Sequence, residues 1–262
     1  MKQTLKLAAL ALLMAGTMTA CVPDTELAGY AWTGSGSYYE DGEQVNTELT
    51  MVCTSSNSGT LFLSETYGDE EMGLCLAMPF TYTWDDNQGT ATATLEIPDD
   101  WKGRNGQAKG TYTFTISMSY TKTEGLIISS SSIEQMFEVP CTSLAMVKKD
   151  YAKPTDMTGT RWAMEFDEFV DIPDGGTVTA HYRYELEFVT ATSAVLNMVM
   201  REEGYDESEN EHWNVNYTYA DGVGHTSIYF DGENVKGGFY MPNATYMTFS
   251  DGINGLDLVK QE

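Results

Sequence analysis

The sequence has few basic residues and lacks the short motifs that mark common enzymes. Its 14 lysines and arginines stand against 39 aspartates and glutamates, for a formal net charge of −25. Nucleic-acid backbones and anionic membrane surfaces are bound by basic patches, so this charge excludes both as electrostatic partners. There is no Gly-x-Ser-x-Gly elbow, no His-Glu-x-x-His pair and no phosphate-binding loop. We therefore expect a protein that is not an enzyme and binds no nucleic acid.

Histidine is scarce as well, and nothing in the sequence predicts a metal site or a cofactor. The three histidines do not have the spacing of metal ligands: His181, His212 and His225. The acidic stretch from Glu202 to Glu211 has no EF-hand pattern and is typical of a solvated loop. Glu165 and Asp167 are spaced like a carboxylate pair, but such pairs are common on the outer face of acidic strands.

Four cysteines are present, and none forms a CxxC pair, so redox catalysis has no visible basis. After Cys21, three remain, which allow at most one disulfide and leave its pairing open. The alternation of side chains places Cys53 on the apolar face of its strand and Cys75 on the polar face, which disfavours a bond between these two. The third candidate is Cys141.

The first 20 residues are typical of an export signal. Two lysines precede an apolar run over 7–15, which is too short to span a bilayer comfortably. The following Met18-Thr19-Ala20-Cys21 resembles the lipobox of bacterial lipoproteins. That resemblance implies cleavage before Cys21 and acylation of this cysteine, since two or more acyl chains anchor a protein stably. Because the body is acidic, the lipid must provide the attachment to the membrane, and residues 21–26 form a lipidated linker.

The remaining chain consists of two copies of one plan. Three segments recur in the same order in each half: Leu27–Trp32 with Met157–Trp162, Phe80–Thr90 with Val215–His225, and Leu144–Lys148 with Leu256–Lys260. Three shared segments in one order indicate a duplication. We expect one domain at 27–148 and another at 157–262, joined by a linker at 149–156.

Both halves alternate apolar and polar residues with the period of a half-buried strand, as in Thr111–Thr121 and Ala180–Phe188. This pattern predicts antiparallel sheets with one wet face, and no window has a helical period. Short connections favour about eight strands per half in up-and-down order, closed into a barrel. In the second half the strands are expected to start near Thr160, Val178, Ser193, His212, Val223, Asn234, Ala244 and Gly255.

The Gly29-Tyr30-Ala31-Trp32 segment and its counterpart Gly159-Thr160-Arg161-Trp162 give each half a resemblance to a known family. Each half resembles a lipocalin-like (calycin) domain of the Bacteroidetes cell-envelope lipoproteins. The resemblance implies two tandem eight-stranded β-barrels in which Trp32 and Trp162 each plug one end. It also implies attachment to the outer membrane, on either its periplasmic or its surface face.

Small barrels can hold one apolar ligand, and an interior rich in tyrosine suits an amphipathic one. The leading hypothesis is a lipid-anchored protein that binds a small apolar or amphipathic ligand, or an envelope partner. The alternative is a structural or adhesive surface lipoprotein of the fimbrial or glycan-utilisation type, with filled barrels. A third reading, a calycin-like enzyme, would need clustered carboxylates at a barrel mouth. The candidate pocket residues are Trp32, Tyr82, Trp84, Tyr112, Phe114, Trp162, Tyr182, Tyr184, Tyr217 and Tyr219.

The lipid anchor can be tested by replacing Cys21 with serine. The Cys21→Ser variant lacks the thiol that receives the diacylglycerol, so it should move from the detergent phase to the aqueous phase in a Triton X-114 partition. Unchanged partitioning of this variant would refute acylation at Cys21.

Overall fold

The computed structural model describes residues 27–40, 42–68, 72–97, 109–137, 139–171, 176–204, 208–230 and 232–262. The expected signal peptide, Cys21 and the linker at 21–26 lie outside these residues. Within them the chain forms sixteen strands and one four-residue helix, and all strand pairings are antiparallel. No helix in the described part is long and apolar enough to cross a bilayer. The predicted all-β antiparallel class is confirmed.

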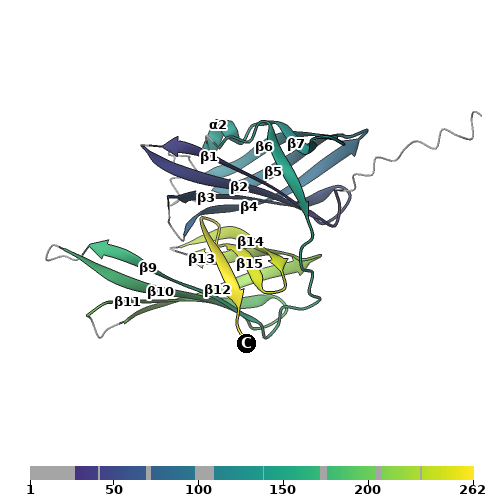
Figure 1. Cartoon of the computed structure of the whole chain (residues 1–262). Coiled ribbons are helices and arrows are strands. Elements are labelled where there is room, and N and C mark those ends of the chain that lie inside the picture. Colours follow the sequence, from purple (N-terminus) through teal and green to yellow (C-terminus); the bar gives the residue numbers. More distant parts are fainter. Residues whose placement is uncertain are drawn as a thin grey trace, which may run out of the picture.

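The first eight strands form a closed barrel in which each strand pairs with the next along the chain (Figure 1). Strand β1 closes the circle by pairing with β8, where Trp32 lies opposite Lys148. This closed antiparallel barrel is compatible with a calycin-like fold. Its elements are β1 (Ala31–Glu40), β2 (Glu43–Cys53), β3 (Ser58–Tyr67), β4 (Gly73–Asp85), β5 (Gln88–Ile97), β6 (Gly110–Thr121), β7 (Gly125–Ser131), α2 (Glu134–Phe137) and β8 (Leu144–Lys149).

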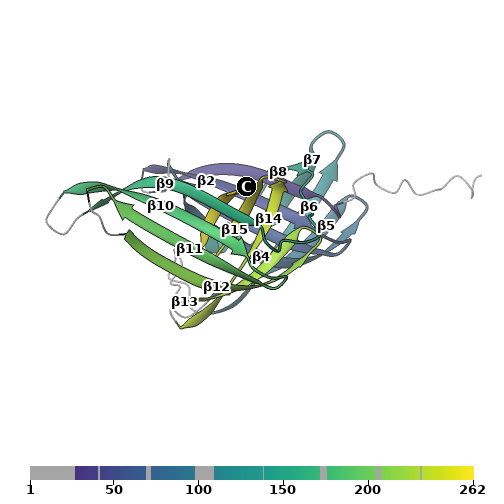
Figure 2. The same cartoon turned by 90° about the horizontal axis from the view of Figure 1, so that it is seen from below.

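The other eight strands also pair in chain order, and β16 returns to β9 at two positions, with Lys260 opposite Trp162 and Val259 opposite Ala163. Beyond Ala163, the described residues offer β9 no second neighbouring strand, so Met164–Asp171 is a free edge. Figure 2 shows β9, β10 and β11 extending past the rest of the molecule. The strands are β9 (Arg161–Asp171), β10 (Thr177–Phe188), β11 (Ser193–Glu202), β12 (Ser208–Ala220), β13 (Val223–Phe230), β14 (Glu233–Asn243), β15 (Tyr246–Ser250) and β16 (Asn254–Lys260).

The expected strand starts agree with the observed ones, and the largest difference is at β12. This strand begins at Ser208 rather than near His212, so Ser208–Glu211 is part of a strand and not of an acidic loop. Glu202, at the other end of the presumed loop, is the last residue of β11. The four-residue helix α2 has no counterpart in the sequence-based prediction, because one turn of helix leaves no periodic signal.

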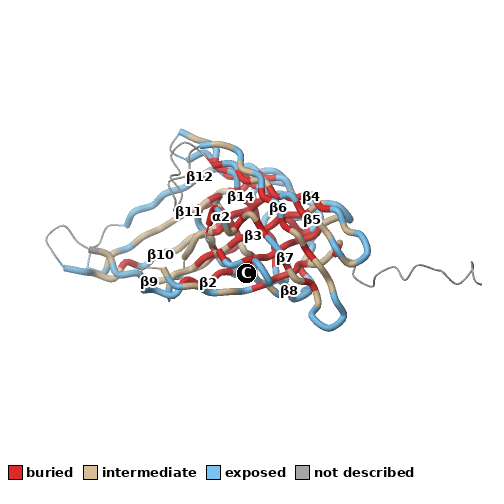
Figure 3. Tube along the Cα trace, turned by 90° about the horizontal axis from the view of Figure 1, so that it is seen from above, coloured by how far each residue is buried: buried red, intermediate tan, exposed pale blue. Residues whose placement is uncertain are grey.

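The two halves are joined into one continuous sheet, which the sequence did not indicate. Strand β16 pairs with β4, with Asn254 opposite Leu74 and Gly255 opposite Gly73. The expectation of two separate sheets is therefore wrong: β16 pairs with β15 along one edge, and along its other edge it pairs with β4 at its start and with β9 at its end. The interiors nevertheless stay separate, since each half has its own cluster of buried apolar side chains. Figure 3 shows that burial is concentrated where the two halves overlie each other.

Matching contacts recur in the two halves at corresponding positions. Tyr82 donates its hydroxyl to the carbonyl of Ser55 at 2.7 Å, and Tyr217 donates to the carbonyl of Thr190 at 2.7 Å. The second contact lies 135 residues after the first, as the step from Ser55 to Thr190 shows. Because the distances and spacing agree, this offset relates positions in β2–β5 to positions in β10–β13.

A third apolar cluster lies between the halves. Phe62 on β3 packs against Tyr240 on β14 with ring centroids 4.8 Å apart, and Ser250 donates its hydroxyl to the carbonyl of Cys75 at 2.5 Å. Cys75 is only 1% exposed. Its assignment to a polar, solvent-facing side of its strand is wrong, because the second half covers the outward face of β4.

The expected linker at 149–156 is packed against both halves. Lys149 is the last residue of β8. Tyr151 is buried and donates its hydroxyl to the carbonyl of Asp221 in the second half at 2.9 Å. Lys153 donates from Nζ to the carbonyl of Gly29 in the first half at 2.8 Å. The connecting segment therefore holds the halves together rather than spacing them apart.

Cys53, Cys75 and Cys141 are all free and buried thiols. Burial raises the pKa of each to about 12. A thiol reacts as its thiolate, so these side chains are chemically inert in the folded protein.

In the Cys21→Ser background, the folded protein should resist iodoacetamide at pH 8, and all three thiols should react once the protein is unfolded in guanidinium chloride. Mass spectrometry counts the added groups. Thr83→Cys is the matched control, since Thr83 is exposed on β4 and a cysteine there should be alkylated quickly. Rapid alkylation of a native cysteine in the folded state would contradict the described burial.

Candidate functional site

The two tryptophans of the first strands lie in matching, buried environments. Trp32 is 3% exposed and donates from Nε1 to the carbonyl of Leu27 at 3.4 Å, whereas Trp162 is 2% exposed and donates to Oγ1 of Thr160 at 3.0 Å. A lysine ammonium lies 5.8 Å from the Trp32 ring and 5.9 Å from the Trp162 ring. Both side chains therefore belong to the apolar cores of their halves.

The other candidates in the first half also fill its interior. Tyr82 and Phe114 are buried, and Tyr112 and Trp84 pack against the same cluster. The Trp84 Nε1 atom is buried without a hydrogen-bond partner in the described part of the protein, and so is the hydroxyl of Tyr219, which occupies the corresponding position of the second half. These four candidates, like Trp32, are parts of the packed core of the first half.

One end of the first barrel is filled by the segment between β7 and β8, which contains helix α2. Five of its apolar side chains are buried: Ile133, Met136, Phe137, Val139 and Cys141. Phe137 packs against Phe114 on β6 with ring centroids 5.9 Å apart. This segment is therefore a plug, and we call residues 132–143 the plug segment.

The second half has no equivalent of the plug segment, because β15 ends at Ser250 and β16 starts at Asn254. The short turn is held by the Asp251 carboxylate, whose Oδ1 accepts hydrogen bonds from the amides of Ile253 at 2.8 Å and Asn254 at 2.7 Å. Gly252 has a φ of +111°, and a Cβ at this position would lie 2.2 Å from Cγ1 of Val235. Glycine is therefore required for so tight a connection.

A cavity of about 230 Å³ lies at this end of the second half. Apolar cavities of about 150 Å³ hold benzene, so there is room here for a larger ring system. Its lining consists mainly of apolar and aromatic side chains, together with two carboxylates: Met72, Tyr184, Leu196, Met198, Glu211, Trp213, Ile228, Phe230, Val235, Asp251, Ile253, Asn254 and Leu256.

Corresponding positions explain why one half is filled and the other is hollow. Phe114 lies opposite Ala93 in the first half, and Val235 lies opposite the corresponding Ile228 in the second. The side chain that contacts the plug segment is thus replaced by a smaller one on the cavity wall. Because Ile228 is larger than its counterpart Ala93, the space at this end results mainly from the missing plug segment.

Of the five second-half candidates, only Tyr184 lines the cavity. Tyr217 is buried, and Tyr219 stacks on Phe239 at 5.8 Å. Tyr182 stacks on Phe166 with centroids 5.1 Å apart and planes 10° apart. The sequence-based prediction missed the cavity residues Glu211, Trp213 and Asp251. Alternation in phase with Val215 could have found the first two, since Glu211 and Trp213 lie four and two residues before it on β12.

Burial and the carboxylates near the cavity raise the pKa values of two tyrosines, Tyr184 and Tyr182. Burial raises the pKa of Tyr184, and the charges of Asp251 and Glu211 add to this effect. The pKa of Tyr182 is raised by burial and then by Glu168, Glu202 and Glu209. Burial also raises the pKa of the Asp251 carboxyl, against the hydrogen bonds that it accepts from Ile253 and Asn254.

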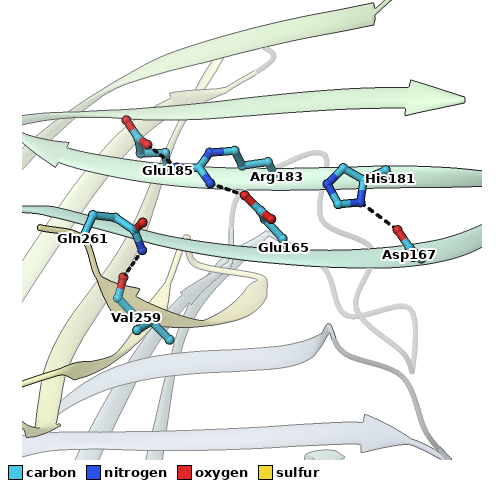
Figure 4. A network of polar contacts seen from close by, with 7 residues as sticks. All are labelled: Glu165, Asp167, His181, Arg183, Glu185, Val259 and Gln261. Carbon is cyan, nitrogen blue, oxygen red and sulfur yellow. Dashed lines mark hydrogen bonds and ion pairs between the residues drawn. The ribbon is translucent and has the colours of Figure 1, made fainter.

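The outer face of β9 and β10 carries an ion-pair network (Figure 4). His181 Nδ1 lies 2.7 Å from Asp167 Oδ1, and Arg183 pairs with Glu165 and, at 2.8 Å, with Glu185. The hydrogen bonds that Arg183 donates to Glu185 and Glu165 raise the pKa of its guanidinium group. Glu165 and Asp167 are thus occupied by basic partners on a surface that faces away from the cavity.

No group of three or more potential metal ligands occurs among the described residues. The chain matches no protein-family model, no curated protein sequence and no solved structure. The site is therefore defined by its own geometry.

Removing the plug should destabilise the protein. Phe137→Ala empties a fully packed position and should cost about 3–5 kcal/mol of unfolding free energy in guanidinium chloride. Phe230→Ala, at the cavity wall where Phe230 is 40% exposed, should cost clearly less. Equal losses for the two variants would mean that Phe137 fills no more of a core than Phe230 does.

Proposed function

We propose that this chain is a lipid-anchored, non-enzymatic protein of the cell envelope that binds a small amphipathic ligand in its second half. In this proposal Cys21 carries the acyl chains that attach the protein to the outer membrane. Residues 27–148 and 157–262 are tandem lipocalin-like domains, joined at 149–156, as the strand order and the repeated contacts support.

The observation that carries the proposal is the cavity at the place where the first half has its plug segment. Proteins fill their interiors closely, so unfilled space lined by aromatic side chains needs an explanation. Trp213 and Phe230 lie on its wall with ring centroids 5.9 Å apart, and Phe230 remains 40% exposed. A ligand with an apolar body would cover this exposed aromatic surface.

Because the first half is filled and the second half contains the cavity, we assign stability mainly to the first half and ligand binding to the second. Its interior contributes core packing, and its β4 strand pairs with β16 next to the Asp251 turn. Met72, just before β4, also lines the cavity. The first half thus provides one wall of the site and a stable partner for the half that contains it.

A structural or adhesive role is the second candidate, and two exposed aromatic side chains favour it. Tyr39 is 75% exposed on β1, and Phe169 is 78% exposed on the free edge of β9. Exposed aromatic residues of this kind contact proteins and glycans. Neither residue belongs to the cavity, so this role does not compete for the same side chains.

The ligand site is tested with N-phenyl-1-naphthylamine, an uncharged probe whose fluorescence rises in apolar surroundings. The mature protein should show a saturable rise. Val235→Phe restores the bulk of the first-half residue Phe114 and should weaken probe binding by about tenfold or more.

Val195→Phe is the matched control. It adds the same side chain at an outward position of β11, between the buried residues Ala194 and Leu196, and should leave probe binding unchanged. If the protein gives no saturable rise, or if Val235→Phe binds like the parent, the cavity is not a ligand site.

A further inference from the structure

We infer that the ligand of the second-half cavity is a cation: a compound with an aromatic or aliphatic body and a positively charged amine or ammonium group. This inference rests on the proposed function, because it specifies the ligand of the same site. It is carried by the position of Glu211 and Asp251 in the cavity lining, by the aromatic walls and by the acidic entrance described below.

The first observation is a carboxylate in the cavity lining, at a position whose counterpart in the first half is apolar. The residue of the first half that corresponds to Glu211, by the offset of 135 residues, is Leu76, which is 0% exposed in the core. Glu211 lies opposite Met198, and both residues line the cavity. Glu211 itself is exposed, so its carboxylate faces the open cavity, where it can pair with a positively charged group of a ligand.

The second observation is that the cavity provides no such partner itself. Among the described lining residues there is no lysine, arginine or histidine, although Glu211 and Asp251 are both present. Asp251 is held in place by its hydrogen bonds to Ile253 and Asn254, which fix its carboxylate at the wall. Two negative charges without a protein cation favour a ligand that supplies the positive charge.

The third observation is that the wall suits the rest of such a ligand. Tyr184, Trp213 and Phe230 contribute aromatic rings, and Met198 adds a polarisable thioether. Aromatic faces attract alkylammonium and arylammonium groups, and they also accept apolar bodies. The same wall disfavours an anion, since the carboxylates would repel it and no described lining residue carries a positive charge.

The fourth observation is an acidic approach to the cavity. Along the inner face of the strands that lead to it, Ala180 lies between Glu168 on β9 and Glu202 on β11, and Glu209 follows on β12, opposite Met200. All three glutamates lie on the same face of the sheet as Tyr182, which is two residues before the cavity residue Tyr184. A mouth of one sign attracts ligands of the opposite sign.

The test uses three probes with one naphthalene body and different charges: 2-naphthylmethylammonium, 2-naphthalenemethanol and 2-naphthoate. Each displaces N-phenyl-1-naphthylamine from the mature protein in 150 mM salt at pH 7.5, where the Debye length is about 8 Å and general charge effects are weak. The ammonium probe should act at a concentration about tenfold lower than the alcohol, and the carboxylate should be the weakest.

Three variants assign the preference to the cavity. Glu211→Gln and Asp251→Asn each remove one interior charge and should reduce the preference for the ammonium probe severalfold. Glu187→Gln removes one charge from the exposed, outward face of β10 and should leave the preference unchanged. Circular dichroism checks that each variant is folded. If Asp251→Asn disrupts the turn between β15 and β16, the result for Glu211→Gln alone decides whether the cavity carboxylates cause the preference.

Equal displacement by all three probes would overturn the cation assignment and leave the ligand site standing. A preference that persists in Glu211→Gln, or that falls equally in Glu187→Gln, would also overturn it, because the net charge would then be the cause. Failure of the reporter probe to bind the parent protein would instead remove the proposed function itself, together with this inference.

Discussion

The width of an eight-stranded barrel is the constraint on which the rest of this structure depends. Such a barrel has room either for its own inward side chains or for one small ligand. A few positions therefore decide between the two outcomes. In the first half, Phe114 and the plug segment at 132–143 close the interior. In the second half, where β16 and β9 pair at only two positions, the three-residue turn that contains Gly252 takes the place of a plug segment and a cavity is present.

Alternation of side chains was sufficient to predict the strands, because each has one apolar face over most of its length. The strand starts at Ser193 and Val223 agree to the residue, and the antiparallel chain order follows from the short connections. The start of β12 was misplaced for a physical reason. Its inward positions carry Glu209 and Glu211, so the strand reads as an acidic loop until Trp213. Charged side chains at the inward positions of β12 therefore interrupt the apolar–polar alternation at the residues that define the candidate site.

The sequence could not show what lies outside a barrel. Cys75 occupies an outward position, and only the docking of the second half turns that position into a core. The plug segment was invisible for a different reason, since a single turn of helix with Met136 and Phe137 has no period to detect. Tyrosine content drew attention to Tyr217 and Tyr219, whose rings are core elements, while the cavity wall is formed by residues of several types. Whether a residue belongs to the core or to the cavity wall depends on long-range packing, which the local sequence pattern does not show.

The free edge of β9 has a consequence for how two copies of the protein would meet. A strand without a neighbour offers its backbone groups to any other chain, and natural edges are protected by charged side chains. Here Glu165, Asp167 and the paired Arg183 crowd the outer face beside that edge. A second copy that added a strand along this edge would have to accommodate these charged side chains beside it. The charges next to the edge therefore disfavour pairing between copies through β9.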